Sequence, residues 1–278
     1  MSVTVKESLT IAIKGLTDSG IPIASTDARI LLAHAMDCEP SRLILIEDNE
    51  VPPDIFRMFE EYLAARKKFQ PVSQIIGGRE FWGRWFLVTT AVLDPRPETE
   101  TLIDVALQNG PCQRILDLGT GSGILAVTLA AEWSDARTVA VDVSDEAIVI
   151  ASKNAIAHGV AERVNIFVSN WFEKVEGRFD LIVANPPYIT AAEMDELSPD
   201  VRNWEPLLAL TPGGDGLESY RTIAATLDKF LANAGLALFE IGHMQGAEVV
   251  NIFKHAGFAD VSIYIDMGGK DRVVSVKR

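Results

Sequence analysis

The sequence has few cysteines, no long apolar run and no excess of basic residues. Only Cys38 and Cys112 occur among its 278 residues, and they form no CxxC pair, so a disulfide framework is not expected. No apolar run approaches the roughly 18 residues needed to span a bilayer. The first residues, MSVTVKESLTIAIKGL, do not have the pattern of a secretion signal. These absences predict a cytoplasmic protein that is not associated with a membrane.

The charge balance is acidic. Lys and Arg total 25 against 39 Asp and Glu, which gives a formal net charge of −14. Proteins that bind nucleic acids usually present a basic face, because they must neutralise phosphates. Direct nucleic-acid binding is therefore disfavoured, although solubility alone could explain the acidic excess.

Metal and nucleophile patterns are missing as well. The four histidines show no spacing typical of metal ligands, and no Ser-His-Asp arrangement is readable. His243 follows an expected strand and could face a cleft, but a surface position is favoured. We expect neither a metal site nor nucleophilic catalysis by a side chain.

Three segments differ in their patterns. Residues 1–70 are typical of a small helical domain, with Ser25-Thr26-Asp27 as a candidate cap of the second helix and Pro53 opening the third. In residues 71–93, aromatic and β-branched residues alternate around glycines, which predicts a β-hairpin connector. Residues 94–278 form the third segment, a larger domain.

The third segment alternates between short apolar strands and helices, which indicates an α/β fold with a mostly parallel sheet covered on both faces. The expected strands are 114–118, 138–142, 164–168, 181–184 and 236–241. The expected helices are 98–109, 123–133, 145–158 and 217–232. At the end, 259–265 and 272–277 flank a glycine pair and predict a C-terminal antiparallel hairpin.

A glycine cluster lies in ILDLGTGSGILAVTLA (115–130), between an expected strand and an expected helix. Gly119, Gly121 and Gly123 permit positive φ and let a ligand approach the backbone closely. The GxGxG spacing differs from the GxGxxG of dinucleotide folds. A tight turn without a ligand is the alternative.

Asp142 stands at the end of the next expected strand, 19 residues after Gly123. An acid at this place in such folds accepts hydrogen bonds from ribose hydroxyls. Its alternative role is to cap the helix that begins near Ser144. Together with the glycines, Asp142 predicts an adenosine-bearing cofactor, either a nicotinamide nucleotide or S-adenosylmethionine.

The stretch Asn185-Pro186-Pro187-Tyr188 follows the fourth expected strand. Prolines fix φ and remove amide donors, so the segment is rigid. An amide or exocyclic amino nitrogen that attacks a methylsulfonium needs two fixed acceptors for its N–H groups. The side-chain oxygen of Asn185 and the carbonyl of Pro186 could supply them, and Tyr188 offers a stacking face. The pattern favours S-adenosylmethionine, while a stiff turn with a packed tyrosine is the alternative.

At this point the sequence resembles the PrmC/HemK family of protein-glutamine methyltransferases over nearly its whole length. The matching stretches are PVSQIIGGREFWG (71–83), PRPETE (95–100), LDLGTGSG (116–123), VDVS (141–144), SNWF (169–172), NPPYI (185–189), VRNWEPLLAL (201–210), GGDGL (213–217) and DRVV (271–274). The resemblance implies a Rossmann-like S-adenosylmethionine-dependent methyltransferase with a small N-terminal helical domain. It implies methylation of the glutamine in the Gly-Gly-Gln motif of peptide chain release factors, with the helical domain helping to dock them. We also expect a monomer.

The resemblance also implies roles for individual residues. Asn185 and Pro186 would be catalytic, and the substrate glutamine would be bound by Asn185, Pro186, Pro187 and Tyr188. The cofactor would be held by Gly119, Thr120, Gly121, Ser122, Gly123, Asp142, Trp171 and Asn185. Trp171 would lie near the adenine, although a buried aromatic residue is an equal alternative.

Two positions depart from the family pattern. Asn170 stands where an aspartate is usual, and Asp94 stands where many relatives carry an aliphatic residue. An amide oxygen at Asn170 can still accept a hydrogen bond from an adenine amino group. Two other functions stay open from the sequence: methylation of an adenine or RNA amino group, and a cofactor-binding scaffold without catalysis.

Overall fold

The structure is a computed structural model that describes residues 3–278. The chain divides into two compact units. The first unit comprises the chain up to Gly78 together with Ser198–Trp204, and the second comprises Arg79–Leu197 and Glu205–Arg278. Each unit has its own apolar core.

The first unit is helical, as predicted. Its elements are α1 (Val5–Asp18), α2 (Ala24–Ala35), the 3-10 helix η1 (Pro40–Ile46), α3 (Pro53–Arg66), α4 (Val72–Ile76) and α8 (Pro199–Trp204). The expected cap at Ser25-Thr26-Asp27 is wrong, because α2 already begins at Ala24. Asp27 is instead buried in its first turn and accepts a 2.7 Å hydrogen bond from Nε of Arg66.

The short helix α8 belongs to the first unit although it lies far along the chain. The indole nitrogen of Trp204 donates to the carbonyl of Lys68 at 3.1 Å, and Nε2 of Gln74 donates to the carbonyl of Trp204 at 3.0 Å. Such long-range contacts leave no local sequence pattern, so α8 was not expected from the sequence.

The hairpin of the expected connector is present but shorter. Strands β1 (Gly78–Phe81) and β2 (Arg84–Leu87) are joined by Trp82 and Gly83, both with positive φ. Positive φ at both central residues is typical of a tight two-residue hairpin turn. The residues before the hairpin form α4 rather than a strand.

The second unit contains a seven-stranded sheet in the order β5-β4-β3-β6-β7-β9-β8. The strands are β3 (Arg114–Leu118), β4 (Arg137–Asp142), β5 (Val164–Val168), β6 (Phe179–Ala184), β7 (Leu231–Glu240), β8 (Asp260–Ile265) and β9 (Asp271–Lys277). β3 to β7 run parallel, and β9 pairs antiparallel with both β7 and β8. The prediction of a parallel sheet completed by an antiparallel hairpin is therefore confirmed.

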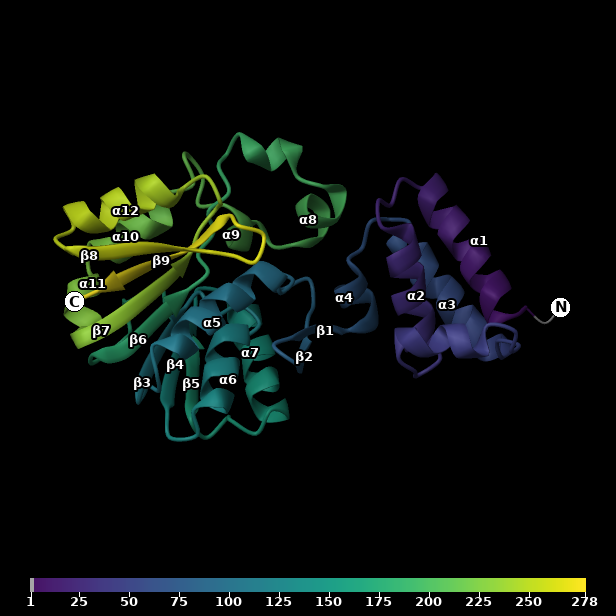
Figure 1. Ribbon diagram of the computed structural model, residues 1–278, viewed down its shortest axis with the longest axis horizontal. Helices are drawn as coiled ribbons and strands as arrows, with labels where there is room; N and C mark the ends of the chain where they lie inside the picture. Colours follow the sequence, from purple (N-terminus) through teal and green to yellow (C-terminus); the bar gives the residue numbers. More distant parts are fainter. Residues whose placement is uncertain (1–2) are drawn as a thin grey trace. The chain divides into compact units, whose positions relative to one another are not determined.

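Helices cover both faces of this sheet (Figure 1). On one face lie α5 (Glu100–Gln108), α6 (Ile124–Glu132) and α7 (Asp145–Ala157). On the other lie α10 (Glu218–Ala224), α11 (Leu227–Phe230) and α12 (Gly246–His255). The remaining short helices are η2 (Pro97–Thr99), η3 (Glu193–Glu196) and α9 (Leu207–Leu210).

Two helix expectations need correction. The single helix expected over 217–232 is two short helices, because the chain turns at 225–226 and β7 begins at Leu231. α12 was missed, although its buried Val249 and Phe253 are spaced four residues apart as on one helix face.

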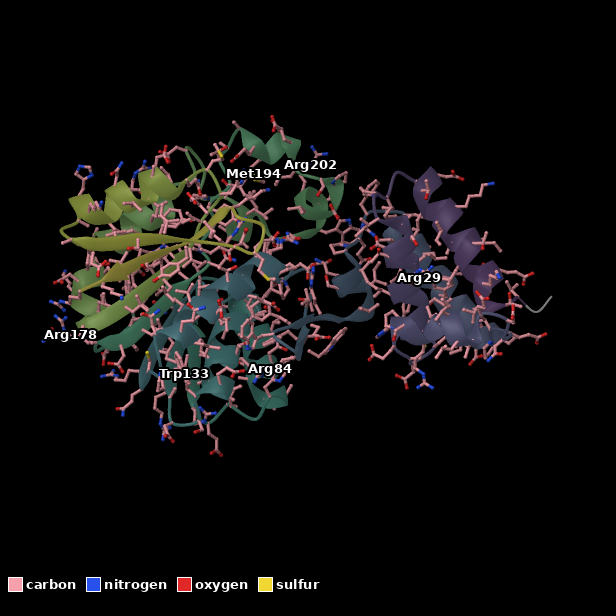
Figure 2. All side chains as sticks on the ribbon, viewed as in Figure 1. Arg29, Arg84, Trp133, Arg178, Met194 and Arg202 are labelled. Carbon is pink, nitrogen blue, oxygen red and sulfur yellow. The ribbon has the colours of Figure 1, made fainter. Side chains whose placement is uncertain are left out.

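The carboxyl ends of β3, β4, β6 and β7 lie at the same end of the sheet, because these strands are parallel. Arg178, labelled in Figure 2, lies at the opposite end of the strands, because it directly precedes the first residue of β6. Trp133, also labelled there, follows α6 in the connection that leads to β4. In open α/β sheets, ligands bind outside the carboxyl ends of the strands. The expected site residues come from these ends.

Candidate active site

A cavity of about 530 Å³ opens at the carboxyl ends of the parallel strands of the second unit. Its volume is in the range of small-molecule sites. Of the residues expected from the sequence, it is lined by 119–122, Asp142, Trp171, Asn185 and Pro187. Gly123, Pro186 and Tyr188 are not among its lining residues.

The glycine turn between β3 and α6 has the expected conformation, with φ of +70° at Gly119, +54° at Gly121 and +84° at Gly123. A Cβ on Gly121 would meet no atom within 4 Å, so this glycine borders open space. A Cβ on Gly123 would lie 3.2 Å from the Cβ of Ala151. Gly123 thus brings α6 and α7 together, and its role in cofactor binding stays a prediction.

Beneath the turn, Asp117 is completely buried. One of its oxygens accepts hydrogen bonds from the Thr120 hydroxyl at 2.6 Å and from the amide of Ala126 at 3.1 Å. Burial raises the pKa of Asp117 to about 7, against the opposing effect of these two hydrogen bonds. Asp117 holds the turn from inside and has no contact with the open cavity.

Asn154 on α7 fixes the turn from another side. Its Nδ2 donates to the carbonyls of Ser122 at 2.7 Å and Leu87 at 3.2 Å, while its Oδ1 accepts from the amide of Leu87 at 2.8 Å. The side chain is buried, and three of its hydrogen-bonding positions are satisfied. Sequence reasoning missed Asn154, because its partners are 32 and 67 residues away.

Asp142 is held by two backbone amides. Its Oδ2 accepts from Gly121 and its Oδ1 from Ser144, both at 2.9 Å. Ser144, not Asp142, caps α7, since its hydroxyl accepts from the amide of Ala147 at 3.2 Å. Burial raises the pKa of Asp142, while the backbone hydrogen bonds lower it. A carboxylate has about four acceptor positions, so this one still has capacity for two hydroxyl groups.

Trp171 and Asn170 line the cavity beyond β5. Trp171 has φ of +48°, and its ring lies 3.7 Å from the position that a Cβ on Gly119 would take. A non-glycine residue with positive φ is uncommon and concentrates at ligand-binding sites. Nδ2 of Asn170 donates to Glu173 at 2.9 Å, which leaves its Oδ1 free to accept a hydrogen bond.

The segment after β6 holds Asn185 at the cavity. Its Nδ2 donates to the Thr99 hydroxyl at 3.3 Å, and its Oδ1 accepts no hydrogen bond from residues 3–278. The carbonyl of Pro187 accepts from Ser219 at 3.2 Å, whereas that of Pro186 has no donor in the described part of the chain. Two adjacent acceptors are therefore unused.

Tyr188 is more enclosed than expected. Its hydroxyl lies 3.5 Å from Oε1 of Glu240, and its carbonyl accepts from Nε2 of Gln245 at 2.9 Å. Burial raises the pKa of the Tyr188 phenol. The ring packs against the apolar core of the sheet face covered by α10 and α12. Stacking of Tyr188 on a substrate stays a prediction.

The structure explains how an aspartate is accommodated at position 94, where many relatives carry an aliphatic residue. Oδ2 of Asp94 accepts from Nη1 of Arg79 at 2.9 Å and lies 3.9 Å from Nη1 of Arg96. Asp94 is buried, so these arginines compensate a carboxylate that an aliphatic residue would not require. Arg96 in turn is bonded to Glu205, a partner that sequence reasoning missed.

Metal and membrane features are absent from the described residues. No group of three or more His, Cys, Asp or Glu side chains within 3–278 has an arrangement that could hold a metal ion. None of the helices in that range combines the length and the apolar character that crossing a membrane demands.

Comparison with known proteins identifies the family of the chain. Residues 7–77 match the PrmC N-terminal domain family, and residues 94–199 match the methyltransferase small domain family. The chain is 50% identical to a release factor glutamine methyltransferase of Cereibacter sphaeroides over 271 residues, which is 98% of this chain and 97% of that protein. A release factor glutamine methyltransferase of Agrobacterium fabrum is 38% identical, with 99% of this chain and 98% of that protein covered.

Among solved structures, a methyltransferase from Pyrococcus furiosus is similar, with a TM-score of 0.54 and 16% identity. The similarity covers 71% of this chain and 90% of that one. At this identity it supports the methyltransferase fold alone.

Proposed function

The chain belongs to the PrmC/HemK family of release factor glutamine methyltransferases, and from this premise we propose its reaction. It transfers a methyl group from S-adenosylmethionine to the side-chain amide nitrogen of the glutamine in the Gly-Gly-Gln motif of peptide chain release factors. The observation that carries this proposal is Oδ1 of Asn185, an unused acceptor on a residue that lines the cavity. The carbonyl of the next residue, Pro186, also has no donor within residues 3–278.

The residues present fit the cofactor. Gly121 leaves room for a ligand against the backbone, and Asp142 keeps acceptor capacity for two ribose hydroxyls. Trp171 and Asn170 line the same cavity, and Oδ1 of Asn170 accepts no hydrogen bond within residues 3–278, which supports contact of these two residues with an adenine. When bound, S-adenosylmethionine supplies an electrophilic methyl group.

The chain orients the substrate carboxamide. Its nitrogen is a poor nucleophile because the lone pair is delocalised into the carbonyl, and positive charge develops on it as it is alkylated. Acceptors that are fixed beforehand stabilise this charge without reorganisation. Pro186 and Pro187 restrict the backbone, so the Pro186 carbonyl and the segment that carries Asn185 are held in place before the substrate binds.

The remaining assignments also belong to this proposal. Residues 1–70 help to dock the release factor, and residues 94–278 carry out the methyl transfer. Residues 71–93 connect these two domains. The protein acts in the cytoplasm as a monomer, without direct contact with nucleic acid. Light scattering coupled to size-exclusion chromatography tests the monomer, and a dimer mass would contradict it.

The reaction is tested by mass spectrometry of release factors after incubation with the protein and S-adenosylmethionine. We expect one added methyl group on the Gly-Gly-Gln glutamine, and none on a release factor with alanine there. Asn185→Ala should reduce the transfer rate by roughly 10²–10³-fold and leave S-adenosylmethionine binding, measured by calorimetry, nearly unchanged. Methylation of nucleic acid but not of release factors would contradict the proposal.

A further inference from the structure

A buried carboxyl group lies behind Asn185. Glu240 is the last residue of β7, and its side chain is 1% exposed. Oε1 is 3.5 Å from the Tyr188 hydroxyl, and Oε2 has no hydrogen-bond partner within residues 3–278. Buried carboxyl oxygens without partners are uncommon and call for an explanation.

Thr99 connects this carboxyl group to Asn185. The Thr99 side chain is completely buried in η2. Its hydroxyl accepts from Nδ2 of Asn185 at 3.3 Å. The Thr99 side chain is also among the groups that lower the pKa of the Glu240 carboxyl, which places the two side chains near each other. The path from Glu240 through Thr99 thus ends on the side chain that lines the cavity.

The direction of the hydrogen bonds along this path depends on the state of Glu240. An ionised carboxylate only accepts, so the Thr99 hydroxyl must donate to it, and the Thr99 oxygen is then left to accept from Nδ2 of Asn185. A protonated Glu240 can donate to Thr99 instead, which frees the hydroxyl hydrogen for Oδ1 of Asn185. The Asn185 carboxamide would then turn its N–H₂ group toward the cavity.

We propose that Glu240 is a positioning residue, which acts through the Thr99 hydroxyl to keep Oδ1 of Asn185, and not Nδ2, facing the substrate amide. This inference rests on the proposed glutamine methylation. An amide N–H group needs an acceptor, and a turned Asn185 would present a donor to a donor. The ionised form of Glu240 is therefore the active one.

The surroundings of Glu240 place its titration in an accessible range. Burial raises its pKa to about 7, while Thr99, Arg272 and Tyr188 lower it. The charge of Glu98 raises it further. The backbone carbonyl of Glu240, not its carboxyl group, accepts from Tyr220 at 2.7 Å.

The test measures single-turnover methyl transfer on a release factor as a function of pH. In the wild type, we expect the rate to rise with pH through an apparent pKa near 7. Glu240→Gln should lower the rate at pH 8 about 10–100-fold, because Gln can either donate to or accept from Thr99. Glu240→Gln should also lack the rise of the rate with pH near pH 7. If this rise persists in Glu240→Gln, it belongs to another group, such as Asp117, and the proposal is overturned.

Thr99 supplies the matched variants. Thr99→Val removes the connecting hydroxyl and should reduce the rate as Glu240→Gln does, while Thr99→Ser restores it. The double variant Glu240→Gln/Thr99→Val should be no slower than Thr99→Val, because both changes break one path. The proposal would be overturned if the double variant lost the product of the two single rate reductions. It would also be overturned if Thr99→Val transferred methyl groups at the wild-type rate.

Two further readouts separate this inference from folding and from the proposed function. Calorimetry should give S-adenosylmethionine affinities within about twofold of the wild type for all variants that show the wild-type circular dichroism spectrum. Infrared difference spectra of the free protein should show buried carboxyl groups that titrate near pH 7, and the signal should be smaller by one carboxyl group in Glu240→Gln, because Asp117 also titrates there. A wild type that methylates no release factor overturns the proposed function, whereas an active wild type with equally active variants overturns this inference alone.

Discussion

Arg96 and Glu205 form an ion pair between segments 109 residues apart, with Nη2 of Arg96 lying 2.7 Å from Oε1 and 2.9 Å from Oε2 of Glu205. The Glu205 side chain is only 1% exposed. The pair joins the loop before η2 to the segment before α9, and both segments contribute lining residues to the cavity. The pair therefore holds the PRPETE stretch against the EPLLAL stretch.

Arg96→Ala should destabilise the second unit. The change leaves the Glu205 carboxylate in a buried place without its guanidinium partner, which costs about 3 kcal/mol of unfolding free energy. Urea unfolding followed by circular dichroism measures this loss. Arg221→Ala, which breaks the exposed pair with Asp215, is the matched control and should change little. Equal losses in both variants would show that the burial of Glu205 does not matter.

Gly121 and Gly123 should respond differently to alanine. Both have positive φ, which costs an alanine about 1 kcal/mol. At Gly121 the new Cβ enters the space bordering the cavity, so S-adenosylmethionine affinity should fall about tenfold with a small loss of stability. At Gly123 the Cβ meets Ala151 at 3.2 Å, so the larger loss should be in thermal stability. Calorimetry and thermal unfolding of both variants test this ranking, and the reverse order would contradict it.

Asn154→Ala should loosen the glycine turn. It deprives the Leu87 amide and the Ser122 carbonyl of their buried partner, and each unsatisfied group costs about 1–3 kcal/mol. We expect an unfolding free energy lower by about 3 kcal/mol and a weaker S-adenosylmethionine affinity, measured by urea unfolding and calorimetry. Asn165→Ala, at an exposed position on β5, is the control. Unchanged cofactor affinity in a destabilised Asn154→Ala would limit its role to folding.

The sequence predicted those parts of the fold in which the residue types of a short segment restrict its conformation. The apolar runs of β3 and β5 and the glycines after β3 were placed correctly because strand burial and positive φ restrict residue type at each position. The expected helix over 217–232 failed because a break at 225–226 contains neither glycine nor proline. α12 was not predicted, although its buried Val249 and Phe253 have the spacing of one helix face.

The candidate site was predictable where a motif presents its own chemistry to the cavity. Asp142 and Asn185 line it as the sequence analysis expected. Thr99, Asn154 and Glu240 were not found, because they act through partners distant in sequence. Thr99 lies in the PRPETE stretch, which does not by itself indicate this role, and Asn154 and Glu240 lie in none of the stretches that resemble the family. Such supporting residues become visible only when the fold brings their partners together.

Glu240→Gln should change the pH dependence of stability. The folded pKa of about 7 lies above the ordinary value of 4.5, so the neutral form stabilises the fold fully below about pH 4.5. This contribution is lost as pH rises through 7, because the unfolded chain gives up the proton first. Since Gln does not titrate, the stability of the variant relative to the wild type should increase between pH 5 and pH 8, by up to about 3 kcal/mol.

Urea unfolding at several pH values measures this difference, with Glu248→Gln at an exposed position of α12 as the control. Parallel curves for the wild type and Glu240→Gln would show that Glu240 ionises as easily in the fold as in the unfolded chain. If the stability of Glu240→Gln relative to the wild type instead increases with pH, the negative charge of Glu240 lowers the stability of the wild type. It does so in the pH range in which the proposed positioning of Asn185 requires Glu240 to be ionised. A carboxyl group retained at such a cost is expected where function and not folding requires the charge.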